Sequence, residues 1–399
     1  MVEIEHHAER RGLSSMEATR GDINPDRRHL PMLDGVRGMA VLMVMVFHFF
    51  RRNAFTDFPA GRFLNSISYI GQTGVDLFFV LSGFLITGIL LHSKDLPNYF
   101  KNFYARRALR ILPLFYLALA FFFFALPVIT DTGIAPARDQ LWVWFNGVNI
   151  PIAFSSRNFQ IPLHFWSLAV EEHFYFVWPA VVLLCTRRGL YVACVGCMVL
   201  SLVVRLIMMK LGLNFFFFTP CRLDSLAVGA MLAIFVRGKT GLAALDRLRP
   251  RIWLAGLFIL MVPIWLFATG TFLTATVKYP MTALLYAAVL ASALNPVRPM
   301  IGKVFSHRLP MVLGKYSYGL YVWDGMIHAC EGRWTSREFV GRLTHFPMLT
   351  LITCVLLQFM VTFAVAALSW HLFEVHFLKL KRFFAYGSST VPELIAAKK

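Results

Sequence analysis

Uncharged apolar runs long enough to cross a bilayer recur along almost the whole chain. Residues 111–130, for example, contain no charged side chain, and about 20 such residues are what an α-helix needs to cross the hydrocarbon core. With 58% hydrophobic residues the chain also exceeds the roughly 45–50% of ordinary soluble domains. The runs do not alternate as the strands of a transmembrane barrel do. The sequence therefore predicts an all-α fold, a polytopic transmembrane helical bundle.

The positions of the charged residues predict how this bundle lies in the membrane. We expect ten principal spans, at roughly 33–50, 69–92, 109–128, 168–185, 189–209, 222–236, 252–269, 278–294, 313–330 and 347–378. With the N-terminus inside, 25 of the 39 lysine and arginine residues fall on the inner side and 12 on the outer side, the bias that cytoplasmic loops carry. Both termini are then cytoplasmic. A polar tail at 1–32 and a basic tail at 379–399 flank a transmembrane domain at 33–378.

The net charge of +18 follows from the same distribution and does not require a nucleic-acid partner. We expect contacts with membrane lipids instead. The last span is unusually long, and we expect it to leave the membrane as a basic amphipathic end, HLFEVHFLKLKRFF. Cys194 and Cys197 form a CxxC, but inside the apolar run YVACVGCMVL, where small residues pack in a span. We therefore predict no metal or redox site.

Four arginines are expected at the inner membrane surface. Arg37 begins the first span, and RRALR at 106–110 ends the inner loop before the third span. Arg107 and Arg110 share a helical face, as do Arg106 and Arg110. Guanidinium groups suit phosphates because they offer paired hydrogen bonds, so the cluster predicts a phosphate-binding site. The alternative for Arg106 and Arg107 is a topogenic role against anionic lipid.

A second group of ionisable residues is expected deeper, toward the outer side. His48 lies 11 residues after Arg37, on the same helical face and roughly 16 Å further along the axis. Other spans carry ionisable residues at a similar depth: Asp76, Glu171, Glu172, Arg222 and Asp224. Buried ionisable groups are costly in a bilayer and are functional by default. The alternatives are that Asp76 caps its helix and that the Arg222 and Asp224 charges hold helices together.

An inner phosphate site and a deeper histidine suggest a long anionic donor whose reactive end meets His48. Histidine takes a proton from a hydroxyl near neutral pH, and a carboxylate on its other nitrogen fixes its tautomer. Acyl transfer from a thioester to an alcohol fits, and so do reactions of phosphate-linked lipid donors. A transporter or flippase would use the same charges as a substrate or ion path, although the sequence shows no inverted repeat. A non-catalytic lipid-binding protein would not need Arg37 and His48 on one face.

Six stretches of the chain carry a family resemblance. They are LDGVRGMAVLMVMVFHF, GVDLFFVLSGFLIT, RRALRILPLFY, FWSLAVEEHFYFVWP, RLDSLAVGAMLA and LGKYSYGLY. With these stretches in order, roughly residues 30–375 resemble acyltransferase family 3, membrane proteins that O-acylate sugars and other hydroxyl compounds with acyl-CoA. The resemblance implies an acyltransferase whose donor is acyl-CoA, commonly acetyl-CoA. It also implies a carbohydrate or lipid-linked sugar as acceptor. We expect a bacterial inner membrane as the location.

The resemblance also implies roles for individual residues. Arg37 and His48 match the family's basic-x10-His pattern, in which the histidine is catalytic. Arg107 and Arg110 match its RxxR pattern, which is implicated in handling acyl-CoA. The stretch WSLAVEE matches one that holds a functional carboxylate, and both Glu171 and Glu172 are candidates for it.

These observations lead to an expected mechanism in which His48 is the general base for an acceptor hydroxyl. A carboxylate, Glu172 or Asp76, would orient the histidine, and Arg222 or Tyr175 would steady the oxyanion. The phosphates of the donor would bind to four arginines, Arg37, Arg106, Arg107 and Arg110. Asp224 and Trp166 would make further contacts with the substrate. In the alternative, His48 takes the acyl group covalently and then passes it on.

Two positions depart from the family pattern. The family often has histidine after its SYxLYLW stretch, where this chain has Asp324 in YVWDG, so no role is carried over from that position. It often has glutamine after the paired glutamates, where this chain has His173. Some members add a C-terminal secreted hydrolase-like domain. Since this chain ends soon after the last span, we expect the stand-alone form.

Overall fold

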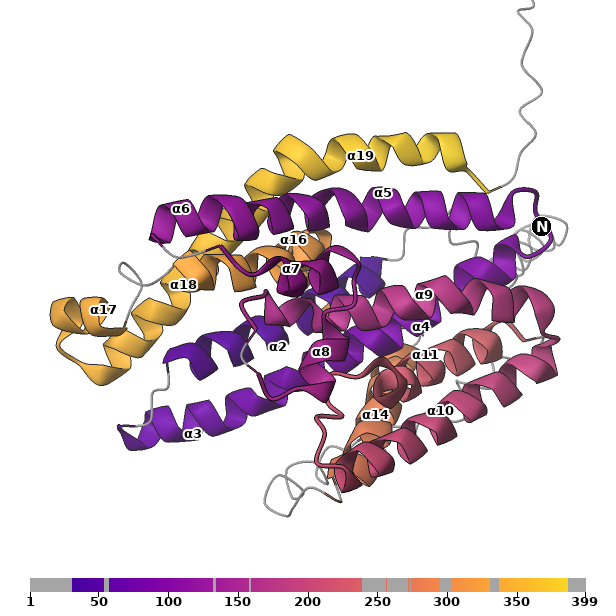
Figure 1. Cartoon of the computed structure of the whole chain (residues 1–399), viewed down its shortest axis with the longest axis horizontal. Helices are drawn as coiled ribbons and strands as arrows, with labels where there is room; N and C mark the ends of the chain where they lie inside the picture. Colours follow the sequence, from indigo (N-terminus) through magenta and orange to yellow (C-terminus); the bar gives the residue numbers. More distant parts are fainter. Residues whose placement is uncertain are drawn as a thin grey trace, which may run out of the picture. The chain divides into compact units, whose positions relative to one another are not determined.

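The computed structural model is helical throughout the part of the chain that it describes (Figure 1). This part comprises residues 31–53, 57–131, 134–157, 159–238, 274–294, 303–330 and 337–386, with Gly256 and Phe272. Within these residues there is no strand, so the predicted all-α fold is confirmed for them. Most of the expected tails and nearly all of the expected span 252–269 lie outside the described residues. The domain boundaries therefore stay predictions.

Nine long helices form the described bundle. They are α2 (Pro31–Asn53), α4 (Gly74–Ser93), α5 (Tyr99–Ala120), α9 (Trp166–Leu184), α10 (Arg187–Lys210), α11 (Leu223–Val236), α14 (Tyr279–Ala293), α16 (Arg308–Cys330) and α18 (Pro347–Ser369). Shorter segments connect or extend them: α3 (Pro59–Ser68), η1 (Tyr69–Thr73), η2 (Phe121–Ala125), α6 (Leu126–Thr130), α7 (Ala137–Trp144), α8 (Asn149–Phe154), η3 (Leu163–Phe165), η4 (Thr219–Arg222), η5 (Thr274–Lys278), α17 (Arg337–Thr344), η6 (Trp370–Glu374), α19 (Val375–Lys379) and η7 (Leu380–Phe384).

Seven described helical segments are long and apolar enough to cross a membrane. They are Met32–Arg51, Pro59–Ser93, Tyr99–Thr130, Leu163–Leu184, Arg187–Lys210, Thr219–Val236 and Pro347–Phe384. Each coincides with one of the ten expected spans. Two more expected spans, 278–294 and 313–330, are helices (α14 and α16) that do not meet the same criterion of length and apolarity. A multi-pass bundle is therefore supported, whereas the count of ten and the orientation stay predictions.

The helices α2 and α16 run parallel in close contact, as the first and ninth spans of the expected topology would. Glycines on both helices permit this approach. A Cβ atom on Gly38 would lie 1.9 Å from the carbonyl oxygen of Pro310, and one on Gly314 would lie 1.9 Å from that of Asp34. Because no side chain fits at these two positions, the glycines fix the register of the two helices.

Substitution of Gly38 tests this register. We expect Gly38→Val to lower stability by at least the roughly 1–3 kcal/mol of an overpacked core, because backbone on α16 must move. The measurement is the thermal unfolding midpoint of the detergent-purified protein. The matched control is Gly196→Val on α10, where no atom lies within 4 Å of an added Cβ. Equal midpoints for the two variants would contradict the close approach of α2 and α16.

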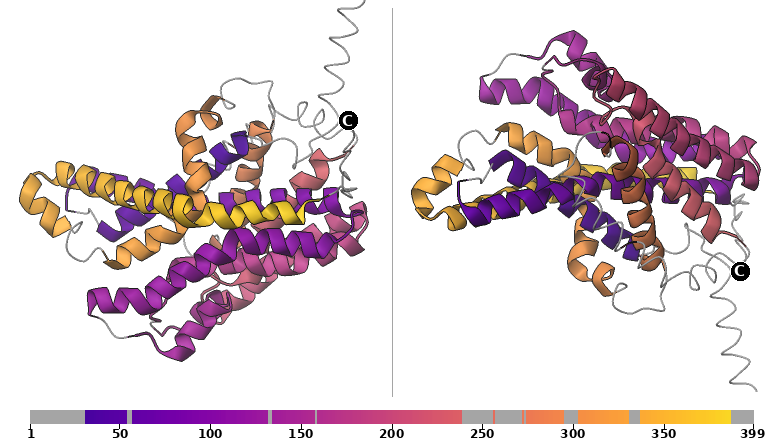
Figure 2. Two further views of the ribbon diagram at one scale, coloured as in Figure 1. Left: turned by 90° about the horizontal axis from the view of Figure 1, so that it is seen from above. Right: turned by 90° about the horizontal axis from the view of Figure 1, so that it is seen from below.

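Hydrogen bonds between distant segments gather the expected inner loops at one end of the bundle. Lys94 Nζ donates to the carbonyl oxygen of Cys185 at 2.8 Å, which ties the turn before α5 to the end of α9. Arg187 Nη1 donates to the carbonyl oxygen of Arg237 at 3.4 Å, which ties the start of α10 to the end of α11. The C-terminal segments α19 and η7 lie alongside α5 (Figures 1 and 2).

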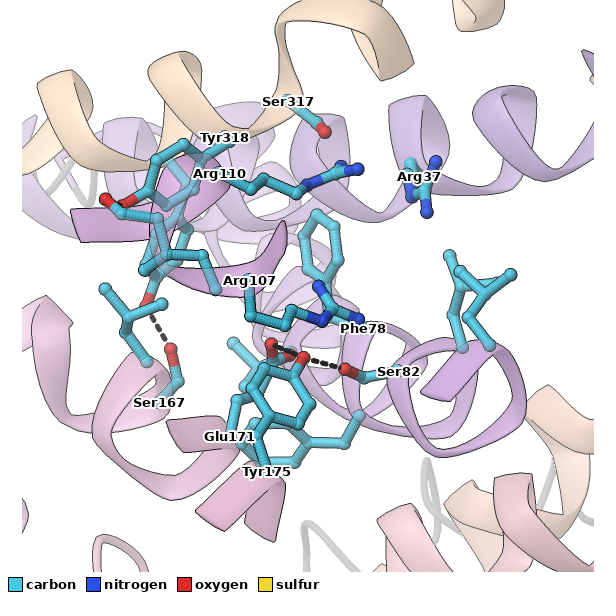
Figure 3. Close-up of a pocket in the computed structure, with 17 residues that line it drawn as sticks. Arg37, Phe78, Ser82, Arg107, Arg110, Ser167, Glu171, Tyr175, Ser317 and Tyr318 are labelled. Carbon is cyan, nitrogen blue, oxygen red and sulfur yellow. Dashed lines mark hydrogen bonds between the residues drawn. The ribbon is translucent and has the colours of Figure 1, made fainter. Parts of the chain in front are cut away.

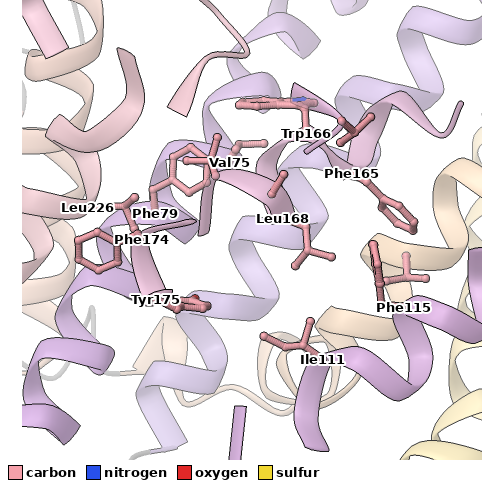
Figure 4. Close-up of a cluster of buried hydrophobic side chains, with 14 of the residues drawn as sticks. Val75, Phe79, Ile111, Phe115, Phe165, Trp166, Leu168, Phe174, Tyr175 and Leu226 are labelled. Atoms are coloured by element: carbon pink, nitrogen blue, oxygen red, sulfur yellow. The ribbon is translucent and has the colours of Figure 1, made fainter. Parts of the chain in front are cut away.

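The apolar core lies where α4, α5, α9 and α11 meet (Figure 4). Aromatic rings dominate it: the rings of Phe79 and Trp166 meet edge to face at 6.1 Å, and those of Phe115 and Phe165 lie 5.2 Å apart. Edge-to-face and tilted pairs of this kind are favoured by the ring quadrupoles. Trp166, expected as a substrate contact, is a buried member of this core.

Candidate active site

A pocket opens between α2, α4, α5, α9 and α16 (Figure 3). It brings together five of the residues predicted from the sequence: Arg37, Arg107, Arg110, Glu171 and Tyr175. These residues come from three helices that are far apart in the sequence. The pocket therefore gathers predicted polar and charged side chains from separate helices into one site.

The three arginines form one cationic wall of the pocket. Arg107 and Arg110 stand three residues apart on α5, and Arg37 comes from the start of α2. Figure 3 shows their guanidinium groups around the same space. Arg37 Nη1 also donates to Asp34 Oδ1 at 2.8 Å, which holds that guanidinium in place. Forked donors around an enclosed space suit the oxygens of a phosphate or diphosphate.

Arg106 does not line the pocket. Its Nη1 donates to the carbonyl oxygen of Phe384 at 3.3 Å, and its guanidinium carbon lies 5.2 Å from the centre of the Tyr386 ring. The guanidinium carbon of Arg107 lies instead 4.5 Å from the Tyr175 ring, inside the pocket. Consecutive residues on a helix point about 100° apart, which sends these two arginines to different partners.

A hydrogen-bonded chain forms the pocket floor beneath Arg107. The Tyr175 hydroxyl donates to Glu171 Oε2 at 2.5 Å, and Ser82 Oγ hydrogen-bonds to the same hydroxyl (Figure 3). Glu172 is not in the pocket lining, and within the described residues its buried Oε1 has no hydrogen-bond partner. The sequence left the two glutamates equivalent, whereas the geometry favours Glu171 as the carboxylate of the pocket.

His48 is paired with a carboxylate that the sequence did not suggest. Its Nδ1 lies 2.5 Å from Asp324 Oδ2; the Asp324 side chain is 2% exposed and that of His48 23%. Neither Asp76 nor Glu172, the two expected orienting groups, has a hydrogen bond to His48 in the described part of the chain. The pairing follows from the register of α2 and α16. His48 and Asp324 each stand ten residues beyond a contact glycine, at matched heights.

Asp76 and Asp224 form buried ion pairs elsewhere in the bundle. Arg222 Nη2 donates to Asp76 Oδ1 at 2.5 Å, and Ser225 Oγ donates to the same oxygen at 3.2 Å. Arg205 Nη1 donates to Asp224 Oδ2 at 2.6 Å. The Arg222–Asp76 pair joins η4 to α4, and the Arg205–Asp224 pair joins α10 to α11. None of Asp76, Arg222 and Asp224 lines the pocket.

A third group of polar residues lines the pocket one helical turn from Asp324, and sequence reasoning missed it. The Tyr321 hydroxyl donates to the carbonyl oxygen of His164 at 2.5 Å and hydrogen-bonds to Ser167 Oγ. Both Ser167 and Tyr321 line the pocket. Tyr321 precedes Asp324 by three residues on α16, so the two share a face. That spacing, within the stretch YVWDG, is the signal that could have linked them.

Comparison with known proteins assigns the family. The family model for the acyltransferase domain of acyltransferase family 3 matches residues 30–373. The chain is a member of acyltransferase family 3. The resemblance inferred from the six stretches is thereby confirmed, and the chain is an acyltransferase of a multi-pass membrane family. Among the described residues there is no group of three or more His, Cys, Asp or Glu side chains that could hold a metal ion.

Several bacterial relatives are similar to this family member. It is 28% identical over 391 residues to the peptidoglycan O-acetyltransferase OatA of Listeria monocytogenes, covering 87% of this chain and 56% of the relative. It is 27% identical over 320 residues to "Putative O-acetyltransferase SACOL0978" of Staphylococcus aureus, covering 74% and 50%. The chain thus spans about half the length of these curated relatives. No solved structure is significantly similar to it.

Proposed function

We propose that this protein is an O-acetyltransferase that moves an acetyl group from acetyl-CoA to a hydroxyl group of a cell-envelope carbohydrate. The observation that carries the proposal is the arrangement of the pocket, with three arginines on one wall and Tyr321, one turn from the His48–Asp324 pair, on another. The names of the relatives supply the acetyl group and the cell-wall sugar, since OatA is a peptidoglycan O-acetyltransferase.

The arginine wall accounts for the donor. CoA carries a diphosphate, and Arg37, Arg107 and Arg110 offer it forked, charge-assisted hydrogen bonds. The rest of the lining is mainly apolar and aromatic, including Phe78 and Leu168, and suits the uncharged pantetheine arm. An arm held between these walls brings its thioester toward Tyr321 and Ser167.

The His48–Asp324 pair accounts for the proton transfer. With Nδ1–H donating to Asp324, His48 Nε2 keeps a lone pair that accepts the proton of the acceptor hydroxyl. The hydroxyl oxygen attacks the thioester carbonyl carbon, and an ester C–O bond forms as the C–S bond breaks. His48 then returns its proton to the departing CoA sulfur, so no proton is gained or lost overall. Of the two residues expected to steady the oxyanion, Tyr175 lines the pocket and Arg222 does not.

Transfer in a purified system tests this proposal. Detergent-purified protein is incubated with acetyl-CoA labelled in the acetyl group and with peptidoglycan fragments as acceptor. We expect release of CoA and the appearance of label in an alkali-labile ester on the fragments. The proposal fails if the protein neither binds nor consumes acetyl-CoA. Solute uptake by proteoliposomes with no acyl transfer would favour the transporter alternative.

The two glutamates provide a matched test of the pocket floor. We expect Glu171→Gln to reduce acetyl transfer by about tenfold or more. Glu171 accepts a hydrogen bond from the hydroxyl of Tyr175, whose ring lies beneath Arg107. A hydrogen bond to a charged group contributes roughly 1.5–3 kcal/mol. Glu172→Gln, which changes a carboxylate outside the pocket, is expected to stay within about twofold of the wild type. A larger loss for Glu172→Gln in equally well-folded protein would reverse the assignment.

A further inference from the structure

The C-terminal basic segment packs against the helix that carries two of the pocket arginines. The helices α19 and η7 pack along α5, the helix that supplies Arg107 and Arg110 (Figure 1). Asn102 Nδ2 donates to the carbonyl oxygen of Ala385 at 3.1 Å. Arg106 Nη1 donates to that of Phe384 at 3.3 Å. The first half of α5 therefore holds the end of the described chain in a defined place.

Arg106 is the centre of this attachment. It bonds the backbone at Phe384 while its guanidinium lies over the ring of Tyr386, 5.2 Å from the ring centre. A guanidinium that bonds a carbonyl oxygen and also contacts an aromatic face uses two distinct recognition modes on one short segment. Arg106 thus fastens the C-terminal segment beside its neighbour Arg107, which faces the pocket.

Lys381 is the residue that this attachment brings toward the arginine wall. It lies on η7, which packs against α5, three residues before the Phe384 carbonyl that Arg106 holds. No carboxylate forms an ion pair with Lys381 in the part of the chain that the structure describes. A partly buried ammonium group beside the helix that carries Arg106, Arg107 and Arg110 is unfavourable by itself. A polyanion bound between them would reverse the sign of this interaction.

We propose that Lys381 is a further donor-binding residue that contacts the 3′-phosphate of acetyl-CoA, and that Arg106 positions it there. The proposal rests on the proposed function, in which acetyl-CoA is the donor. Arg37, Arg107 and Arg110 line the pocket, whereas Lys381 is not part of the lining and stands on η7, which packs against α5. In CoA the diphosphate is attached directly to the pantetheine arm, and the 3′-phosphate lies beyond it on the ribose. We therefore match the diphosphate to the three arginines that line the pocket and the 3′-phosphate to Lys381, which stands outside the lining.

Two nucleotides and one neighbouring residue make the test specific. The probes are acetyl-CoA and acetyl-dephospho-CoA, which lacks only the 3′-phosphate. The matched control is Arg382→Ala, since Arg382 is an exposed cation of the same segment whose guanidinium lies 4.8 Å from the ring of its neighbour Phe383. Lys381→Ala removes the proposed contact, Lys381→Met keeps most of the side-chain volume without the charge, and Lys381→Arg keeps the charge.

Dissociation constants for detergent-purified protein give the readout. We expect Lys381→Ala and Lys381→Met to weaken acetyl-CoA binding by about tenfold, because each removes one charge-assisted hydrogen bond. Both variants should leave acetyl-dephospho-CoA binding unchanged. Lys381→Arg should restore most of the affinity and Arg382→Ala should change neither constant. Arg106→Ala should reproduce the nucleotide selectivity of Lys381→Ala.

The outcomes separate this inference from the proposed function. Suppose that the wild type binds acetyl-CoA and that the Lys381 variants weaken the binding of both nucleotides equally, or of neither. The 3′-phosphate contact is then wrong, and acetyl-CoA remains the donor. If the wild type binds neither nucleotide, the proposed donor itself is wrong. If Arg382→Ala weakens acetyl-CoA binding as much as Lys381→Ala does, the general charge of the segment explains the effect. The specific contact of Lys381 is then overturned.

Discussion

The His48→Ala variant is expected to lose acetyl transfer by about 10²- to 10⁴-fold, the range typical of a general base. Its dissociation constant for acetyl-CoA should stay at the wild-type value, because His48 is not among the residues that line the pocket. The measurement is a single-turnover rate with labelled acetyl-CoA and acceptor, together with equilibrium binding. Near wild-type turnover in well-folded His48→Ala protein would remove the histidine from the mechanism.

Asp324 gives this prediction an internal control. We expect Asp324→Asn to slow transfer less than His48→Ala does, because the amide still fills the site but no longer supports a protonated imidazole. In the His48→Ala background, Asp324→Asn should reduce the transfer rate little further. The effects of substitutions at residues that act as one unit are strongly non-additive. Fully multiplicative losses would show that Asp324 acts independently of His48.

The second large effect is expected at the arginine wall. Arg107→Ala with Arg110→Ala should raise the dissociation constant for acetyl-CoA by about 10²-fold or more, because each charge-assisted hydrogen bond contributes roughly 1.5–3 kcal/mol. The remaining affinity should depend less steeply on salt, since fewer charged contacts are left to screen. Isothermal titration at two salt concentrations measures both quantities.

Arg188→Ala is the matched control for the arginine prediction. Arg188 is an exposed residue at the start of α10 and lies outside the pocket. It belongs with Arg107 and Arg110 to the expected inner side, so its removal changes the local charge without touching the proposed site. If Arg188→Ala weakened acetyl-CoA binding as much as the double substitution does, general electrostatic attraction would explain the binding. Specific contacts in the pocket would not be needed to explain it.

The sequence predicted which segments form long apolar helices. Apolar run lengths located seven segments that the structure bears out as candidate spans. Helical spacing grouped Arg107 with Arg110, and both line the pocket together with Arg37. These predictions succeed because run length and residue spacing depend on one helix at a time. They require no knowledge of which helices are neighbours.

What the sequence did not predict is which helices meet. Depth alone placed Asp76 near His48, yet Asp76 on α4 pairs with Arg222 on η4. The carboxylate that does reach His48, Asp324, is 276 residues away, and the family pattern pointed to a histidine there. Two residues at one depth can stand on opposite sides of a bundle. The glycine contacts between α2 and α16 decide this case, and close backbone approach between distant segments is not visible in a single sequence.

The most direct test of the account measures binding and turnover of labelled acetyl-CoA in parallel for three proteins. The wild type should bind acetyl-CoA and release CoA with acceptor present. The His48→Ala variant should bind without turnover, and the Arg107→Ala/Arg110→Ala variant should fail to bind at concentrations that saturate the wild type. If His48→Ala lost binding while the double arginine variant still bound and turned over, the roles assigned to the two ends of the site would be contradicted.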